Sequence, residues 1–80
     1  MEVEVGKTYK QFKGDLYLVL GIGKHSETEE DMVIYKALYG DNLVWIRPLD
    51  NFTEEVNRNG QKYRFEKIII ESKKESWKSF

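Results

Sequence analysis

The sequence predicts a mostly β protein: a small five-stranded SH3-like β-barrel with one short helical turn before the last strand. Three observations support this fold class. Short apolar runs alternate with turn-forming residues along the chain, which is typical of all-β domains. Gly21 and Gly23 lie late in the longest run, where glycine marks the bulges and bends that curl a small sheet. The chain also lacks the helix that the alternative, an OB-fold, would need.

The first half of the chain contains three expected strands. Val5–Phe12 is the first, and it ends at a tight turn in which Gly14 can adopt a positive φ angle. Leu16–Lys24 is the second strand. The polar segment His25–Asp31 then leads to the third strand, Met32–Tyr39. Each run is therefore bounded by residues that favour turns over the hydrogen-bonded pairing of β-strands.

The second half begins with the turn Gly40–Asn42, whose residue types suit left-handed φ angles. Leu43–Arg47 is the fourth strand, and Pro48 ends it because proline has no N–H to donate to a ladder. A helical turn is expected over Pro48–Phe52. The remaining expected elements are a loop at Asn57–Gly60 and a fifth strand at Tyr63–Ile70.

Alternation along the third and fourth strands predicts which face is buried. Lys36 indicates that its own side of the third strand, with Met32, Ile34 and Leu38, faces outward. The expected inner set is therefore Val33, Tyr35, Ala37 and Tyr39. In the fourth strand, Leu43, Trp45 and Arg47 lie opposite Val44 and Ile46. Apolar residues thus remain on the outer face, and the C-terminal tail or a partner would have to cover them, unless they stay exposed.

Length and composition limit the function classes. The chain has 80 residues, which predicts one domain over residues 1–70 and a flexible charged tail at 71–80. Its 13 basic and 14 acidic residues give a net charge of -1, which argues against a nucleic-acid binder that depends on a basic surplus. With no cysteine, no signal-peptide pattern and no membrane-length apolar run, we expect a cytoplasmic monomer without a cofactor.

The densest polar and aromatic residues predict a non-catalytic binding surface. Trp45 and Arg47 alternate onto one face, so the guanidinium can lie beside the indole and meet an anion or a carboxylate. A purely structural stack, or a salt bridge to Glu27 or Glu30, is the alternative for Arg47. We expect the curled sheet to bring two groups of residues together: the polar turn that begins at His25, and the face of the fourth strand that carries Trp45 and Arg47. The resulting concavity would bind a peptide segment, a protein or a small anionic ligand. The predicted site residues are His25, Ser26, Glu27, Thr28, Tyr35, Tyr39, Trp45, Arg47 and Phe52.

Two other functions stay open. One is a small hydrolase with His25 as base, Ser26 as nucleophile and Glu27 as the orienting group. Adjacent residues point in different directions and no nucleophile elbow is present, so local capping of the turn is the competing interpretation. The other is single-stranded nucleic-acid binding, in which bases stack on Tyr9 and Tyr63 if the first and last strands are neighbours. Its basic strip is Lys7, Lys10, Lys13, Lys62, Arg64 and Lys67.

A metal site is not expected, because the chain has one histidine and no cysteine.

Three patterned runs carry a family resemblance: KGxxYxVLGIxxHSET from Lys13, VxYxALYG from Val33 and WxRPLxxF from Trp45. On these runs the chain resembles the small bacterial family known as domain of unknown function 1653, over roughly residues 6–65. The resemblance implies an SH3-like barrel and brings no established activity.

The chain departs from this family at three positions. The family tends to have a histidine where Gln11 stands, a small apolar residue where Lys24 stands and a leucine where Glu29 stands. Gln11 therefore argues against two histidines forming a metal or catalytic pair.

Overall fold

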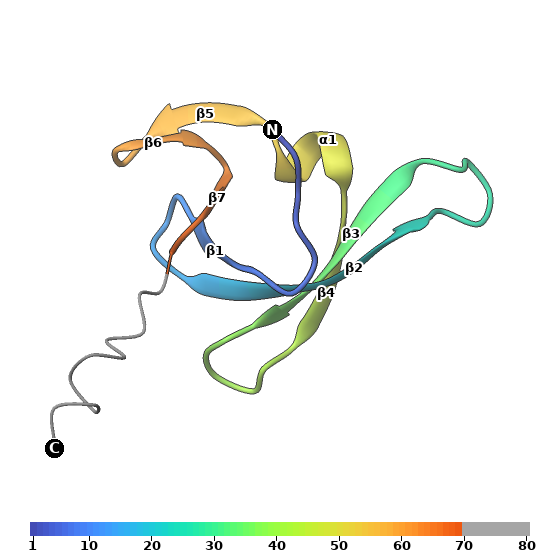
Figure 1. Cartoon of the computed structure of the whole chain (residues 1–80), viewed down its shortest axis with the longest axis horizontal. Coiled ribbons are helices and arrows are strands. Elements are labelled where there is room, and N and C mark those ends of the chain that lie inside the picture. Colours follow the sequence, from blue (N-terminus) through green and yellow to red (C-terminus); the bar gives the residue numbers. More distant parts are fainter. Residues whose placement is uncertain (70–80) are drawn as a thin grey trace, which may run out of the picture.

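The structure is a computed structural model, and it describes residues 1–69. This part of the chain is mostly β, with seven strands and one helical turn (Figure 1). The predicted tail at 71–80 lies outside the described residues. The elements are β1 (Thr8–Gln11), β2 (Leu16–Lys24), β3 (Asp31–Ala37), β4 (Val44–Pro48), α1 (Leu49–Phe52), β5 (Glu55–Arg58), β6 (Gln61–Tyr63) and β7 (Phe65–Lys67).

Five of the strands form one antiparallel sheet in the order β4-β3-β2-β1-β7. The first and last strands are neighbours, which is the arrangement that the basic strip requires, and Tyr9 of β1 lies opposite Lys67 of β7. Strands β4 and β7 are the two edges of this sheet, and within residues 1–69 no ladder joins them. The mostly β class is therefore confirmed, whereas closure into an SH3-like barrel is not.

The sheet contains the predicted bulge. The register between β2 and β3 shifts by one residue between Val19 and Gly21, because β2 carries an extra residue there. Beyond the bulge the two strands continue as a long hairpin, which extends away from α1 and from the β5–β6 hairpin (Figure 1). The turn that follows Lys24 consequently lies at the far end of this hairpin.

The β5–β6 hairpin is the main element that the sequence analysis missed. Arg58 lies opposite Gln61, so Asn59 and Gly60 form a two-residue connection, and both have positive φ angles of 52° and 80°. Positive φ at both positions is the geometry of a type I′ turn, for which Asn-Gly is the preferred dipeptide. The predicted loop at 57–60 is thus the tip of a hairpin.

The predicted fifth strand at 63–70 is divided in two. Its first residue ends β6, and its central part forms β7. The division occurs at Arg64, whose N–H donates to the carbonyl of Glu54 while its own carbonyl accepts the N–H of Phe12. The backbone therefore leaves the small sheet and enters the large one at this residue.

The helical turn expected after the fourth strand is confirmed as α1. Pro48 precedes it with a φ of −54°, and Thr53 closes it by donating a side-chain hydrogen bond of 2.9 Å to the carbonyl of Leu49. The turn places Phe52 in the interior with no exposed surface.

No helix in residues 1–69 has both the length and the apolar character that crossing a membrane requires.

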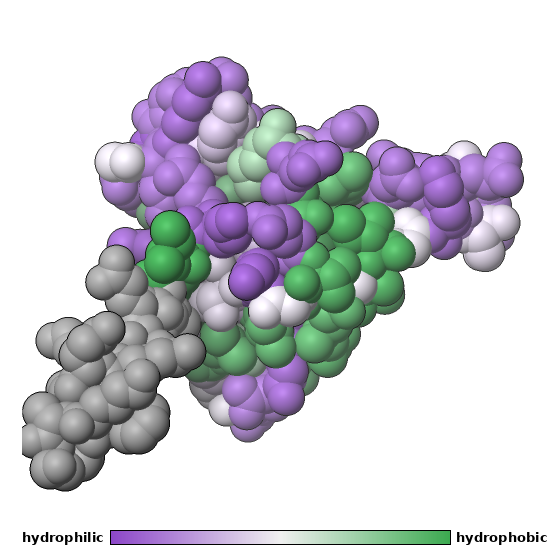
Figure 2. Space-filling model, in the orientation of Figure 1, coloured by the Kyte–Doolittle hydropathy of each residue, from purple (hydrophilic) through white to green (hydrophobic). Residues whose placement is uncertain are grey.

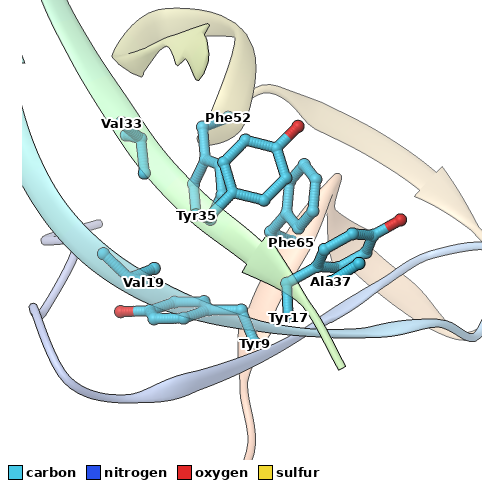
Figure 3. Packing of buried hydrophobic residues seen from close by; sticks show 8 residues of the cluster. All are labelled: Tyr9, Tyr17, Val19, Val33, Tyr35, Ala37, Phe52 and Phe65. Atoms are coloured by element: carbon cyan, nitrogen blue, oxygen red, sulfur yellow. The ribbon is translucent and has the colours of Figure 1, made fainter. Parts of the chain in front are cut away.

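The core is largely aromatic (Figure 3). The rings of Phe52 and Phe65 stack at a centroid distance of 4.1 Å, and Tyr35 contacts both edge-on at 5.4 Å. Alternation along the third strand predicts its inner residues correctly as far as Ala37, whereas Tyr39 lies beyond the end of β3 and is 45% exposed. The buried cluster consists of Tyr9, Tyr17, Val19, Val33, Tyr35, Ala37, Phe52 and Phe65.

Candidate functional site

A small pocket opens over the inner face of the sheet, next to the aromatic core. Its volume is about 140 Å³. The hydroxyl oxygens of Tyr17 and Tyr35 both point out of the core cluster on the same side (Figure 3). The pocket therefore has an aromatic floor and a polar rim. Its lining residues are Gln11, Tyr17, Tyr35, Tyr39, Trp45 and Arg47.

Arg47 is held in place on one side of this pocket. Its Nε–H donates to the hydroxyl of Tyr35 at 3.0 Å, and its Nη1–H donates to Oδ1 of Asn51. The guanidinium carbon lies 5.5 Å from the centre of the Phe65 ring, a distance at which a cation–π attraction operates. Three contacts from β3, β7 and the helical turn thus fix the orientation of this planar group.

The charge of Arg47 has no carboxylate partner within residues 1–69, where the salt bridges join other side chains. The salt bridge to Glu27 or Glu30 that the sequence left open is absent from that set. A guanidinium has five N–H donors, and two of those on Arg47 are used by Tyr35 and Asn51. Three donors consequently remain for a bound acceptor.

The tyrosines of the pocket form a hydrogen-bonded pair. The hydroxyls of Tyr17 and Tyr39 lie 2.8 Å apart, and the hydroxyl of Tyr17 also donates to Oε1 of Gln11 at 3.5 Å. Burial raises the pKa of Tyr17 above its ordinary value, and the hydrogen bond with Tyr39 raises it further. Tyr17 therefore stays protonated at neutral pH and presents a neutral polar group to the pocket.

Four of the predicted site residues line this pocket: Tyr35, Tyr39, Trp45 and Arg47. Phe52 does not line it, because its ring lies fully buried under the edge of Tyr35. Gln11 and Tyr17 were missed as site residues. Tyr17 lies opposite Ala37 of β3, and alternation within β2 places it on the inner face.

The polar turn after β2 is ordered by its own side chains. Nδ1 of His25 accepts hydrogen bonds from the backbone N–H groups of Glu27 at 3.1 Å and Thr28 at 3.3 Å. Oγ1 of Thr28 in turn accepts from the N–H of Glu30 at 3.2 Å. The imidazole thus caps its own turn, which is the local bonding that the sequence analysis left open as the competing interpretation.

The structure separates this turn from the pocket. Trp45 lies opposite Tyr35 of β3, whereas the N–H of His25 bonds the carbonyl of Glu30, which immediately precedes β3 and lies five residues before Tyr35. Five residues of extended chain span about 16 Å. The two clusters that were expected to share one concavity therefore lie at different points along β3, because the hairpin continues beyond the bulge.

Comparison with known proteins now identifies the family. The family model described as "Protein of unknown function (DUF1653)" matches residues 7–67. The chain belongs to the DUF1653 family. A DUF1653 protein from Bordetella bronchiseptica has a similar crystal structure, with 33% sequence identity and a TM-score of 0.69 over 80% of this chain and 85% of that chain. No curated protein matches the chain.

The predicted basic strip of this DUF1653 protein is partly neutralised. Lys62 pairs with Glu55 at 3.6 Å, Arg64 pairs with Glu54 at 2.6 Å, and Lys67 pairs with Glu4. Lys67 and its hydrogen bond lower the pKa of Glu4. Half of the six proposed phosphate-binding groups thus already contact a carboxylate, which weakens the case for a nucleic-acid surface.

The DUF1653 chain also offers little support for the hydrolase alternative. Within residues 1–69, no hydrogen bond joins Ser26 to His25, and no group of three or more His, Cys, Asp or Glu side chains could hold a metal ion. A nucleophile needs a base within hydrogen-bond reach. The Trp45–Arg47 pocket is therefore the stronger candidate site.

Proposed function

We propose that this DUF1653 protein is a non-catalytic binding module that holds an anionic group, such as a carboxylate, on Arg47. The single observation that carries the proposal is the guanidinium itself. It is oriented by Tyr35, Asn51 and the Phe65 ring, it keeps three unused N–H donors, and within residues 1–69 it has no carboxylate partner. A half-buried arginine of this kind favours an anion from outside.

The fixed orientation of Arg47 supports tight and specific recognition. A free arginine side chain loses on the order of 2 kcal/mol of rotamer entropy when it is ordered. In this fold the contacts with Tyr35 and Asn51 have already ordered the side chain before any ligand arrives. A planar carboxylate can then accept two parallel N–H bonds at little further entropic cost.

The size of the pocket supports a small group as the ligand. Sites for drug-sized molecules measure roughly 300–1,000 Å³, whereas this pocket measures about 140 Å³. One side chain or one head group fits, but a nucleotide does not. Trp45 is 48% exposed at the rim, and its indole would cover the apolar atoms next to the anion.

The proposal includes an SH3-like architecture for the domain. Support comes from the curved five-stranded sheet (Figure 1), from the bulge between Val19 and Gly21, and from the helical turn that follows the fourth strand. A cytoplasmic location belongs to the same proposal. In this view the inner face of the sheet, next to an open edge, serves as the recognition surface.

The test uses benzoate as a carboxylate with an aromatic body and benzamide as its neutral counterpart. We expect benzoate to shift the NMR signals of the Trp45 indole N–H and the Arg47 Nε–H, and benzamide to leave both nearly unchanged. Arg47→Gln should weaken benzoate binding at least about tenfold, because a charge-assisted pair contributes about 1.5–3 kcal/mol. Arg47→Lys should recover only part of the affinity, because an ammonium group cannot form the two-pronged bond.

Arg58→Gln is the matched control. Arg58 is exposed, and its guanidinium lies over the Phe12 ring at 5.3 Å instead of in the pocket. This variant should bind benzoate like the wild type. Equal responses to benzoate and benzamide, or equal losses in the two arginine variants while both remain folded by circular dichroism, would contradict the proposal.

A further inference from the structure

Strand β4 forms an open edge of the large sheet. Within residues 1–69 it pairs only with β3. The N–H of Ala37 donates to the carbonyl of Leu43 at 2.9 Å, and the same register continues through Trp45 and Arg47. Because ladder bonds alternate along an antiparallel strand, these odd-numbered residues direct their backbone groups to β3. The N–H and C=O groups of Val44 and Ile46 therefore point to the free side.

Between Val44 and Ile46 this edge lacks the usual protection against pairing, and the charge of Arg47 and the proline at position 48 come only at its end. Val44, Trp45 and Ile46 are 55%, 48% and 65% exposed, and none of them is charged. Natural proteins commonly guard an edge strand with charges, bulges or a covering segment. A hydrophobic, uncharged stretch of edge such as Val44–Ile46 is a template for another strand.

The opposite edge, β7, is guarded. Glu66 accepts the backbone N–H groups of Lys62 and Tyr63 on the adjoining strand β6, and Lys67 pairs with Glu4. Charges and neighbouring backbone therefore occupy that side. Of the two edge strands of the large sheet, β4 is therefore the one whose free side is available for pairing.

The surface around β4 differs between its two faces. Hydrophobic surface covers the region of β2, β3 and β4, away from the polar tip of the β2–β3 hairpin (Figure 2). On the outer face, Val44 and Ile46 lie opposite Lys36 and Ile34 of β3. On the inner face, Trp45 and Arg47 line the pocket. A strand added to β4 would thus meet apolar side chains outside and an indole and a free cation inside.

We propose that β4 binds an extended peptide as an added antiparallel strand, with an acidic residue of the peptide opposite Arg47. The inference rests on the proposed function and specifies its ligand. The register determines the rest of the motif: residues that follow the acidic one lie opposite Ile46, Trp45 and Val44 in turn. The motif is therefore acidic, aliphatic, aromatic, aliphatic.

Each position of the motif has a physical reason. The acidic side chain lies on the inner face, within reach of the unused donors of Arg47. The aromatic residue lies on the same face and pairs with Trp45 across the two strands. The two aliphatic residues lie on the outer face, and their backbone groups exchange hydrogen bonds with Ile46 and Val44.

A second copy of the chain fits the edge less well. If two β4 strands paired about a two-fold axis at Trp45, the exposed backbone groups of Val44 and Ile46 would match. Arg47 would then lie opposite Leu43 of the second copy, and its free donors would gain no acceptor. The charge on the inner face therefore favours an acidic peptide.

The experiment titrates the full chain with the blocked peptide acetyl-Thr-Glu-Val-Tyr-Val-Thr-amide by NMR and calorimetry. We expect shifts along β4, centred on Ile46 and Trp45. N-methylation of either valine should weaken binding at least about tenfold, because it removes one ladder hydrogen bond and blocks the close approach. N-methylation of the tyrosine, whose N–H points away from β4, should change binding less than about threefold.

Changing the glutamate of the peptide to glutamine should weaken binding to the wild type about tenfold and have little effect on Arg47→Gln. If both valine and tyrosine N-methylation are harmless while the glutamate dependence persists, strand addition is wrong and the anion site stands. If neither the glutamate nor benzoate matters, both proposals fail. Sedimentation of the free chain as a dimer with β4 in the interface would assign the edge to a second copy and overturn the inference.

Discussion

The stacked pair of Phe52 and Phe65 is expected to be the strongest single source of core stability. The two rings are parallel within 1° at 4.1 Å, and Phe52 also meets Tyr9 and Tyr35 edge-on at 5.5 and 5.4 Å. Both phenylalanines are fully buried. Each aromatic pair contributes about 0.5–1.5 kcal/mol beyond its buried area. Phe52→Leu removes three such pairs and keeps most of the volume.

We expect Phe52→Leu to lower the free energy of unfolding by about 2–3 kcal/mol, with a fall in Tm of roughly 10–20 °C for a domain of this size. Alanine would cost about 3–5 kcal/mol. An 80-residue chain has a net stability of only about 4–12 kcal/mol, so leucine is the safer substitution. Urea unfolding followed by circular dichroism gives the free energy by linear extrapolation.

The pair itself is measured by a double-mutant cycle over Phe52→Leu and Phe65→Leu. We expect a coupling energy of about 0.5–1.5 kcal/mol between the two positions. Val5→Thr is the control, because Val5 is 55% exposed, and it should change stability by less than about 0.5 kcal/mol. A Phe52→Leu loss below about 1 kcal/mol, or additive single changes, would refute the assignment of stability to the stack.

Three further outcomes test other parts of the fold. Gly60→Ala should cost about 1–2 kcal/mol in urea unfolding, because Gly60 has a φ of 80° that alanine tolerates poorly, whereas Gly21→Ala should be nearly neutral, since its Cβ would meet only Ile34 at 4.0 Å. Because the pKa of Tyr17 is raised in the folded state, the contribution of this group to stability is complete below pH 10 and falls as the pH rises further. Tyr39→Phe removes the hydrogen bond to Tyr17 and should lower the midpoint pH of tyrosinate absorbance. An unchanged midpoint would exclude this hydrogen bond as a cause of the raised pKa. Because the pKa of Glu4 is lowered in the folded state, its ionised carboxylate stabilises the fold above pH 4.5, and this stabilisation is lost as the pH falls through the lowered pKa. Lys67→Met should return the pKa of Glu4, measured by NMR titration, toward 4.5.

The sequence predicted the parts of the fold that depend on local patterns. Alternation along the third strand placed Val33, Tyr35 and Ala37 inside, because Lys36 had to reach water. Gly21 marked the bulge, and Pro48 marked the end of the fourth strand. The β5–β6 hairpin was missed because its strands are short and polar, although Asn59 and Gly60 are a strong turn signal.

The sequence predicted four of the residues that line the pocket, and local alternation accounts for two of them. Trp45 and Arg47 share a face by alternation, and the structure places both at the pocket. Gln11 joins them from β1, across the curl of the sheet, and no local pattern encodes that approach. The His25 turn was misplaced because residue types do not reveal how far a hairpin extends past its bulge.

The pairing of β1 with β7 has a consequence for synthesis of the protein. Tyr9 and its partner Lys67 lie 58 residues apart in the sequence. A ribosome that adds about 5–20 residues per second needs roughly 3–12 seconds to cover that interval. During this delay the nascent chain has neither the strand that covers β1 nor the ring of Phe65, so folding is completed only late in translation. Shortening the chain before Phe65 should therefore yield a product that chaperones and proteases recognise.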